Sequence, residues 1–304
     1  MDERRPPPGA PRLMQPGCLR RLERWAAGRG VRLERLRYSR PEAGGETAAL
    51  RLSPPGAARA RVVAAHGAGD DALYPLVAVF RALVEDGAEV FAFDLDGHGR
   101  TSTTRFSPET IAGAVPAAVA EATRGRPDLP LHLFGHSFGG SLVLHALGAG
   151  AVPRAASAVA VSAPVAVAPT WGIVLAEALS VLRPATLAQR RHYGVWGLLP
   201  AAGSFKRGAF PFRCGTPGAT GYVDEVRRAL AVLALERTAA EIRRPVLLVH
   251  GSGDRLVPPE NAERLARAIP GAALALLPGL THFGTAIAPE TAERVRDWVR
   301  CRAH

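Results

Sequence analysis

Residues 131–140 read LHLFGHSFGG, and this stretch decides the fold of the chain. The apolar residues 131–134 predict a short buried strand, and the small residues at 140–148 predict a helix directly after it. Between them, the pattern G-x-S-x-G places Ser137 between two glycines, each two positions away. A turn this tight needs those glycines because larger side chains would collide. We therefore expect Ser137 at the carboxyl end of a strand, above a helix N-terminus.

Short, nearly continuous apolar runs recur on both sides of this turn, which is typical of strands covered on both faces of a parallel sheet. They lie at residues 61–65, 89–95, 131–134, 158–161 and 245–249, with a last strand at 273–277. Helical stretches separate them, at about residues 73–85, 108–123, 141–147, 259–268 and 289–300. This alternation predicts right-handed crossovers and a doubly wound, mostly parallel sheet.

The N-terminal part of the chain follows other patterns. Residues 1–17 contain five prolines and predict a disordered or extended tail. Apolar residues at helical spacing predict a short amphipathic helix over residues 18–27. Residues 31–38 and 47–52 alternate in hydrophobicity and predict an antiparallel strand pair, turned at residues 42–45.

The net charge of +11 is concentrated near the N-terminus. Residues 1–61 carry 14 arginines and 6 acidic residues, a balance of +8, whereas residues 62–304 have a balance of +3. Lys206 is the single lysine among 38 basic residues, which indicates a compositional bias towards arginine. The basic segment is either a solvated edge or a weak anchor to anionic surfaces. No nucleic-acid-binding motif accompanies it, so we expect no nucleic-acid partner.

The cysteines and the hydropathy pattern predict a cytoplasmic location. Cys18, Cys214 and Cys301 are far apart and odd in number, which argues against a disulfide framework or a zinc site and fits a reducing compartment. The N-terminal residues do not show a positively charged start followed by an apolar core, so we expect no secretory signal. Residues 155–176 carry no charge, but they are rich in alanine and interrupted by two prolines. We expect a buried strand there, not a membrane span.

The alternation of strands and helices breaks over residues 165–241, which we interpret as a helical lid over the carboxyl ends of the strands. This stretch holds seven of the 18 aromatic residues, namely Trp171, Tyr193, Trp196, Phe205, Phe210, Phe212 and Tyr222. It also contains helix-like apolar runs at residues 173–182 and 229–235. Trp171, Tyr193 and Trp196 are our candidates for substrate binding. The alternative is a set of extra helices that pack elsewhere.

A serine hydroxyl is a poor nucleophile unless a base removes its proton and a carboxylate orients that base. Among nine histidines, we choose His282 as the base because it lies in the expected loop between the last strand and the last helix. His66 and His250 also end strands, but a glycine follows each directly. His136 adjoins the serine and is expected to point into the packing, and His304 is terminal.

Asp254 follows the predicted strand at residues 245–249 and is our candidate for the orienting acid. The chain order serine, aspartate, histidine is the order found in α/β-hydrolases. Backbone N–H groups placed in advance must also stabilise a developing oxyanion. We expect one from Phe138, which follows the serine, and one from Ala68 in the loop HGAG after an early strand.

Four motifs, HGAG, DLDGHGRTS, GHSFGG and HGSGDRLVP, resemble those of the α/β-hydrolase superfamily over about residues 62–298. Together they are most similar to the monoacylglycerol-lipase and serine-aminopeptidase-like branch. The resemblance implies an α/β-hydrolase fold with a lid over a largely apolar pocket, an ester or amide hydrolase, no cofactor, and the same oxyanion hole. It also implies that DLDGHGRTS shapes its loop and takes no part in catalysis. The chain departs from the branch in its residues 165–241 and its Arg-rich N-terminus.

These observations define the expected organisation: a tail at residues 1–17, an α/β-hydrolase core at 18–164 and 242–304, and a lid at 165–241. The expected function is a serine hydrolase that cleaves hydrophobic or lipid-like carboxylic esters through Ser137, His282 and Asp254, with no metal. A thioesterase or acyltransferase that acts on an acyl-thioester stays open as an alternative. A non-catalytic binding protein with the same fold is a further alternative. Ser137 stands where dehalogenase and epoxide-hydrolase relatives have aspartate, which argues against those two chemistries.

Overall fold

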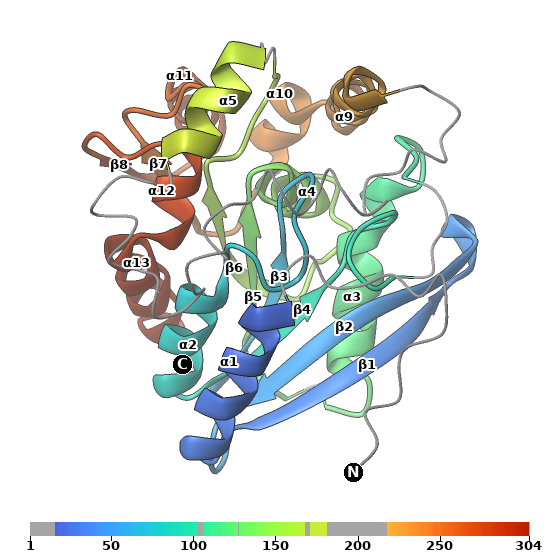
Figure 1. Cartoon of the computed structure of the whole chain (residues 1–304), viewed down its shortest axis with the longest axis vertical. Coiled ribbons are helices and arrows are strands. Elements are labelled where there is room, and N and C mark those ends of the chain that lie inside the picture. Colours follow the sequence, from blue (N-terminus) through green and yellow to red (C-terminus); the bar gives the residue numbers. More distant parts are fainter. Residues whose placement is uncertain (1–15, 102–105, 127, 168–170, 181–217, 304) are drawn as a thin grey trace.

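The computed structural model describes residues 16–101, 106–126, 128–167, 171–180 and 218–303 (Figure 1). Within them, eight strands form one sheet in the order β1-β2-β4-β3-β5-β6-β7-β8. The strands are β1 (Arg32–Arg40), β2 (Gly45–Ser53), β3 (Ala60–Ala65), β4 (Ala88–Phe93), β5 (Leu131–His136), β6 (Ala155–Val161), β7 (Val246–Gly251) and β8 (Ala273–Leu277). β2 is antiparallel to both of its neighbours, whereas β3 to β8 run parallel. The predicted doubly wound, mostly parallel sheet is confirmed.

The helices of the described residues lie on both faces of the sheet and at the carboxyl ends of its strands (Figure 1). They are α1 (Pro16–Gly28), α2 (Val77–Glu85), α3 (Ala114–Thr123), α4 (Phe138–Gly148), α5 (Trp171–Ser180), α9 (Gly218–Leu233), α10 (Leu235–Thr238), α11 (Glu260–Ala268), α12 (His282–Ile287) and α13 (Pro289–Arg300). Short 3-10 turns occur at η1 (Pro41–Ala43), η2 (Ile111–Gly113) and η5 (Ala239–Glu241). No helix among these residues is both long and apolar enough to cross a membrane.

Several helix boundaries differ from the sequence-based expectations, among them those of α1, α2 and α3. α1 begins at Pro16, so residues 16–17 belong to a helix and not to the predicted tail; proline fits the first turn because its missing N–H would be unbonded there. α2 begins later than predicted because the Asp71 carboxylate accepts the backbone N–H groups of Leu73 and Tyr74 and forms a turn, each bond at 2.9 Å. α3 is preceded by η2 and a turn instead of continuous helix.

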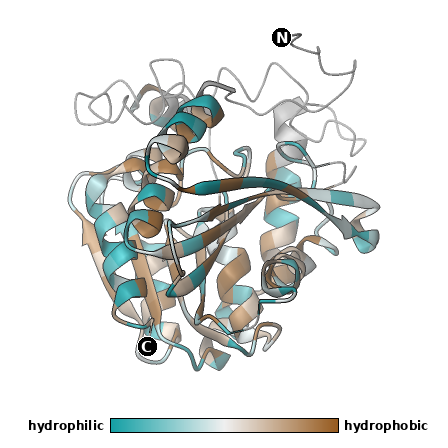
Figure 2. Cartoon of the chain, turned by 90° about the horizontal axis from the view of Figure 1, so that it is seen from below, coloured by the Kyte–Doolittle hydropathy of each residue, from teal (hydrophilic) through white to brown (hydrophobic). Residues whose placement is uncertain are grey.

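Two apolar layers cover the sheet. One contains side chains of α1, α2 and α13, and the other contains side chains of α3, α4, α9 and α11. Seen from below in Figure 2, hydrophobic residues run along the central strands, and the β1–β2 hairpin carries hydrophilic segments along its length. This hairpin therefore forms the partly solvated edge of the sheet, whereas the parallel strands are buried between helices.

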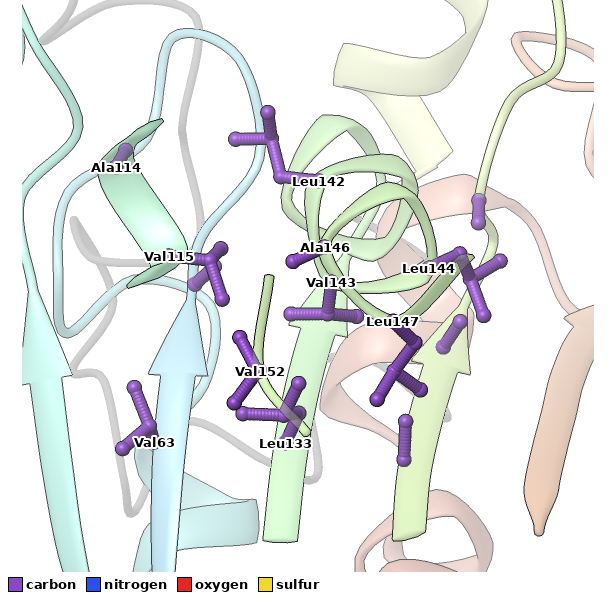
Figure 3. Packing of buried hydrophobic residues seen from close by; sticks show 14 of the residues in the cluster. Val63, Ala114, Val115, Leu133, Leu142, Val143, Leu144, Ala146, Leu147 and Val152 are labelled. Atoms are coloured by element: carbon purple, nitrogen blue, oxygen red, sulfur yellow. The ribbon is translucent and has the colours of Figure 1, made fainter. Parts of the chain in front are cut away.

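α4 is the central helix of the second layer and starts directly after Ser137. Its apolar residues surround the helix on nearly all sides, as expected for a helix buried in the core. Figure 3 shows Val143 and Ala146 of α4 in this layer together with Leu133 of β5 and Val115 of α3. Because this helix is packed on several sides, its N-terminus holds the preceding serine in a fixed place.

Candidate active site

Ser137 lies in the turn between β5 and α4, in a strained backbone conformation. Its φ is 52° and its ψ is −124°, which non-glycine residues rarely adopt. Its own N–H donates to the carbonyl of Val161 at the end of β6, at 2.8 Å. The bond and the packed helix hold the turn and leave the serine side chain half-buried at the carboxyl edge of the sheet.

The two glycines that flank Ser137 are required by close backbone contacts. A Cβ on Gly139 would lie 2.3 Å from the carbonyl oxygen of Ala65 and 2.4 Å from that of His66. A Cβ on Gly135 would lie 2.3 Å from the carbonyl oxygen of Gly139. Since real side chains do not approach backbone so closely, only glycine fits either position. This explains the spacing of the G-x-S-x-G pattern.

The structure brings Ser137, His282 and Asp254 together in one chain of hydrogen bonds. The His282 Nε2 atom lies 2.9 Å from Ser137 Oγ, and its Nδ1 atom lies 2.7 Å from Asp254 Oδ2. His282 is 2% exposed, so its ring is almost completely removed from water. When Nδ1–H donates to the carboxylate, Nε2 is free to accept the serine proton.

His282 is the first residue of α12, whereas the sequence predicted that it lies in a loop. Thr281 precedes the helix, and its hydroxyl accepts the N–H of Gly284 at 3.3 Å. The helix has six residues, too few to show a helical hydrophobic period, and the sequence therefore gave no sign of it. The expected position between β8 and α13 is nevertheless correct.

Asp254 is fixed by bonds to its own loop. Its Oδ1 atom accepts the N–H groups of Leu256 and Val257 at 3.0 and 2.8 Å, which leaves Oδ2 for His282. His250 lies close by, with Nε2 3.4 Å from Asp254 Oδ2 and 2.8 Å from the carbonyl of Val257. The carboxylate is thus oriented from several sides before any substrate arrives.

The pKa values of this pair are shifted apart. Burial alone would lower the pKa of His282, but the charge of Asp254 and the hydrogen bond to it raise the pKa above its ordinary value. Burial would raise the pKa of Asp254, yet His282 and the N–H of Val257 hold it below its usual value. Such opposed shifts are typical of an acid that stays ionised while it supports a base.

Hydrogen bonds join the loop HGAG to the segment DLDGHGRTS, for which the resemblance implied a role in shaping the loop. The N–H of Gly69 donates to His98 Nε2 at 3.1 Å, and the N–H of Leu95 donates to His66 Nε2 at 2.8 Å. Both rings are buried, and burial lowers the pKa of His98 to about 4 and lowers that of His66 as well. A neutral imidazole nitrogen can accept a hydrogen bond, so His66 and His98 fix the loop through these two bonds.

The two predicted oxyanion donors are Phe138, which follows the serine in the chain, and Ala68, which lies in the loop after β3. Phe138 is the first residue of α4, where a backbone N–H has no partner within the helix. Ala68 follows Gly67, and a Cβ on Gly67 would lie only 3.1 Å from the Cβ of Ser137. The loop therefore passes directly beside the serine.

The predicted substrate-binding residues are only partly covered by the structure. Tyr193 and Trp196 lie outside the described residues. Trp171 is the first residue of α5, but its side chain is not among those described. In the described part of residues 165–241, α5 and α9 lie beyond the carboxyl ends of the strands (Figure 1).

Two buried acids near His282 were not identified from the sequence. Asp70, in the loop after HGAG, has Oδ2 3.6 Å from Nδ1 of His136, whose ring lies 5.1 Å from that of His282. Glu177 of α5 is 3% exposed and interacts electrostatically with His282. Glu177 is the first charged residue after Arg154. A single acid after a long uncharged stretch is the sequence feature that could have identified it. No cluster suited to hold a metal occurs among the residues placed in the structure.

Comparisons with known proteins identify the family and the fold of the chain. The chain is 36% identical to mouse protein phosphatase methylesterase 1 over 91 residues, and these residues make up 29% of this chain. It is also 37% identical over 67 residues, or 22% of this chain, to an uncharacterized abhydrolase domain-containing protein of Dictyostelium discoideum. The chain spans only 23% of the length of the methylesterase and 7% of the length of the Dictyostelium protein in these matches. Among solved structures, Est1E of Butyrivibrio proteoclasticus with bound ferulic acid has a TM-score of 0.60 and 18% identity, over 85% of this chain and 96% of that one.

A soluble variant of monoglyceride lipase from Saccharomyces cerevisiae, in complex with a substrate analogue, is similarly close in fold. Its TM-score is 0.61 at 17% identity, over 89% of this chain and 95% of the lipase chain. Residues 56–284 match the model of the family described as serine aminopeptidase, S33. Because these residues make up most of the chain and include both loops and strands of the site, the chain belongs to this family of α/β-hydrolases.

Proposed function

We propose that this protein is a serine hydrolase that cleaves carboxylic esters with a hydrophobic acyl group. The observation that supports this most strongly is the continuous hydrogen-bond chain from Ser137 Oγ through His282 to Asp254, at 2.9 and 2.7 Å. These distances are within the reach needed for proton transfer. The strained turn at Ser137 supports the same function, since it presents the hydroxyl at the sheet edge.

In the first half of the reaction, Ser137 Oγ attacks the ester carbonyl carbon while its proton passes to His282 Nε2. The carbonyl oxygen becomes negatively charged, and the N–H groups of Ala68 and Phe138 donate to it. Asp254 stabilises the imidazolium that forms. The bond between carbon and the alcohol oxygen then breaks, and His282 gives its proton to the leaving alcohol.

In the second half, water takes the place of the alcohol. His282 removes a proton from the water, whose oxygen attacks the acyl carbon, and the bond to Ser137 Oγ breaks. The serine regains its proton from His282, and the carboxylic acid leaves. The residues alone supply every proton transfer, so the proposed reaction requires no cofactor.

A hydrophobic acyl group fits the surroundings of the site. We propose that residues 165–241 form the lid, with Trp171, Tyr193 and Trp196 in contact with the substrate. Leu179 of α5 and Val232 of α9 are 55% and 50% exposed, so described helices of this segment present apolar side chains at their surface. A solved monoglyceride lipase with a similar fold supports an ester substrate of this class.

Turnover of p-nitrophenyl esters from short to long acyl chains, by the wild type and by Ser137→Ala, tests the proposal. We expect the wild type to hydrolyse the esters, with an optimum at medium or long chains, and the variant to be inactive. A fluorophosphonate probe should label the wild type covalently and leave the variant unlabelled.

Three outcomes would count against parts of this proposal. A wild type that shows neither turnover nor labelling would overturn it and favour a binding protein. Faster turnover of an acyl-thioester than of the matched oxygen ester would reassign the substrate to thioesters. An optimum at the shortest acyl chains would contradict the hydrophobic pocket.

A further inference from the structure

Helix α5, which comes from the proposed lid segment, contacts the helix that carries His282. α5 lies beside the N-terminal end of α12 (Figure 1). The Ser180 Oγ atom, at the end of α5, lies 2.9 Å from the hydroxyl oxygen of Thr281, and both residues are buried. Thr281 is the residue directly before His282 and accepts the N–H of Gly284. A side chain of α5 thus bonds directly to the residue that starts α12.

Glu177 is a second contact, one helical turn before Ser180. Burial raises the pKa of the Glu177 carboxyl group, whereas the charge of His282 and the backbone N–H groups of His282 and Phe283 act in the opposite direction. Its backbone carbonyl accepts the Ser180 hydroxyl at 2.7 Å. Glu177 and Ser180 therefore act on three consecutive residues at the start of α12.

The burial of Glu177 is costly for the fold. The residue is 3% exposed, and its Oε2 atom has no hydrogen-bond partner among the described residues. A buried, incompletely satisfied carboxylate lowers stability, so its presence beside a catalytic histidine points to a functional reason.

We propose that Glu177 and Ser180 of α5 are positioning residues that seat His282 for proton transfer from Ser137. Through them the proposed lid segment is coupled to the general base, and a displacement of α5 moves the imidazole. The inference rests on the proposed function, because it assigns a role relative to the same serine and histidine. It goes beyond the triad by making the base depend on a helix outside the core.

The charge of Glu177 also acts on the protonation of His282. The groups that face this ring are Asp254, Glu177, Asp70, His136 and His250. After Asp254, Glu177 is the charge that most raises the pKa of His282. Loss of this negative charge therefore lowers the pKa of His282, whereas loss of the Ser180 hydroxyl changes no charge. The two residues have separable effects.

The test is the rate of covalent labelling of Ser137 by a fluorophosphonate, measured from pH 5 to 9. The full-length variants are Glu177→Gln, Glu177→Asp and Ser180→Ala. Asp224→Asn is the matched control, because it makes the same acid-to-amide change at an exposed position of α9 in the same segment. Thermal unfolding of each variant is measured in parallel.

We expect Glu177→Gln to slow labelling by between about tenfold and 100-fold at high pH, the scale of a small misplacement in an active site. The acidic limb of its labelling rate against pH should move to lower pH than in the wild type. Its melting temperature should equal or exceed that of the wild type. Ser180→Ala should slow labelling without moving the limb. Glu177→Asp should restore the limb of the wild type, and Asp224→Asn should match the wild type throughout.

The results separate this inference from the proposed function. If the wild type is not labelled at all, the proposed function fails. If the wild type is labelled and both Glu177→Gln and Ser180→Ala react at its rate with its pH profile, the positioning role is wrong. A lower melting temperature with an unchanged rate and limb would overturn it in favour of a purely structural role.

Discussion

At the residue scale, Asp254 offers the sharpest single change. In Asp254→Asn, Oδ1 still accepts the N–H groups of Leu256 and Val257, so the loop keeps its shape. The amide NH2 then faces His282 Nδ1 and favours the wrong tautomer. We expect turnover to fall by about 10⁴-fold with little change in stability.

Ester turnover and urea unfolding of the same preparation check this expectation. Asp297→Asn at the exposed end of α13 is the control, and it should leave both measurements unchanged. An Asp254→Asn variant with nearly wild-type turnover would remove the aspartate from the proposed triad.

The pH dependence of kcat/KM follows from His282 as well. The base is active only when it is neutral, so kcat/KM should rise with pH through the pKa of His282. Asp254, together with Glu177, raises that pKa above the ordinary 6.5, although burial opposes them. We therefore expect the midpoint of the acidic limb above pH 6.5, measured with a neutral ester. A midpoint below pH 6.5 would show that burial outweighs the carboxylates.

At the scale of elements, the turn from β5 to α4 depends on Gly139. A methyl group there would approach the carbonyl oxygens of Ala65 and His66 to 2.3 and 2.4 Å. The turn or β3 must shift, and we expect Gly139→Ala to cost about 3 kcal/mol of unfolding free energy, within the range for overpacking, and to abolish turnover.

The matched control for this change is Gly28→Ala. A Cβ at Gly28 meets nothing within 4 Å, so the same substitution should be harmless there. Urea unfolding and ester turnover of both variants provide the comparison. Wild-type activity in Gly139→Ala would mean that the turn tolerates a side chain and that its glycine is not required.

Helix α1 covers part of the sheet and is not a peripheral appendage. Leu22 is 1% exposed within the apolar layer that α1 shares with α2, and Trp25 Nε1 donates to Glu85 of α2 at 3.2 Å. Leu22→Ala should lower the unfolding free energy by about 2–5 kcal/mol. The exposed neighbour Arg21→Ala should change it by less than about 0.5 kcal/mol. Equal unfolding curves for the two variants would contradict the packing of α1.

At the scale of the whole molecule, buried ionisable groups set the response of stability to acid. Burial lowers the pKa of His98 and His132 to about 4, and it also lowers those of His66, His136 and His250. Between pH 6.5 and 4 the unfolded chain binds more protons at these sites than the folded one. Stability contributed by the neutral histidines is therefore lost as the pH falls through this window.

Buried acids act in the opposite direction. Burial raises the pKa of Asp94 to about 7 and also raises those of Asp70 and Glu177, so the folded state binds more protons there below pH 7. His282, whose pKa is raised in the folded state, acts in the same direction as these acids. Because the five histidines with a lowered pKa outnumber His282 and the three acids, we expect the unfolding free energy to be lower at pH 5 than at pH 7. Urea unfolding at both values measures it, and His132→Gln, distant from the site, should reduce the difference. A higher stability at pH 5 would show that the acids dominate.

Most of the sheet could be predicted from the sequence because its strands are local features. The run at residues 62–65 is apolar throughout, which is typical of a strand covered on both faces. The pattern around Ser137 likewise encodes its turn, since its glycines are needed where the backbone passes close to residues nearby in the chain and to the end of β3. Chain order then placed Asp254 and His282 at the same edge of the sheet.

The sequence by itself determined the fold class, the order of the strands along the chain and the three residues now found in one hydrogen-bond chain. Only the tertiary structure decided what surrounds them: the backbone N–H groups that donate to the rings of His66 and His98, the pair of Asp70 and His136, and the buried carboxylate of Glu177. Local patterns report which residues are apolar and where the chain turns. They carry no information on contacts between side chains far apart in the chain, such as Ser180 and Thr281, because such contacts arise only when the helices pack.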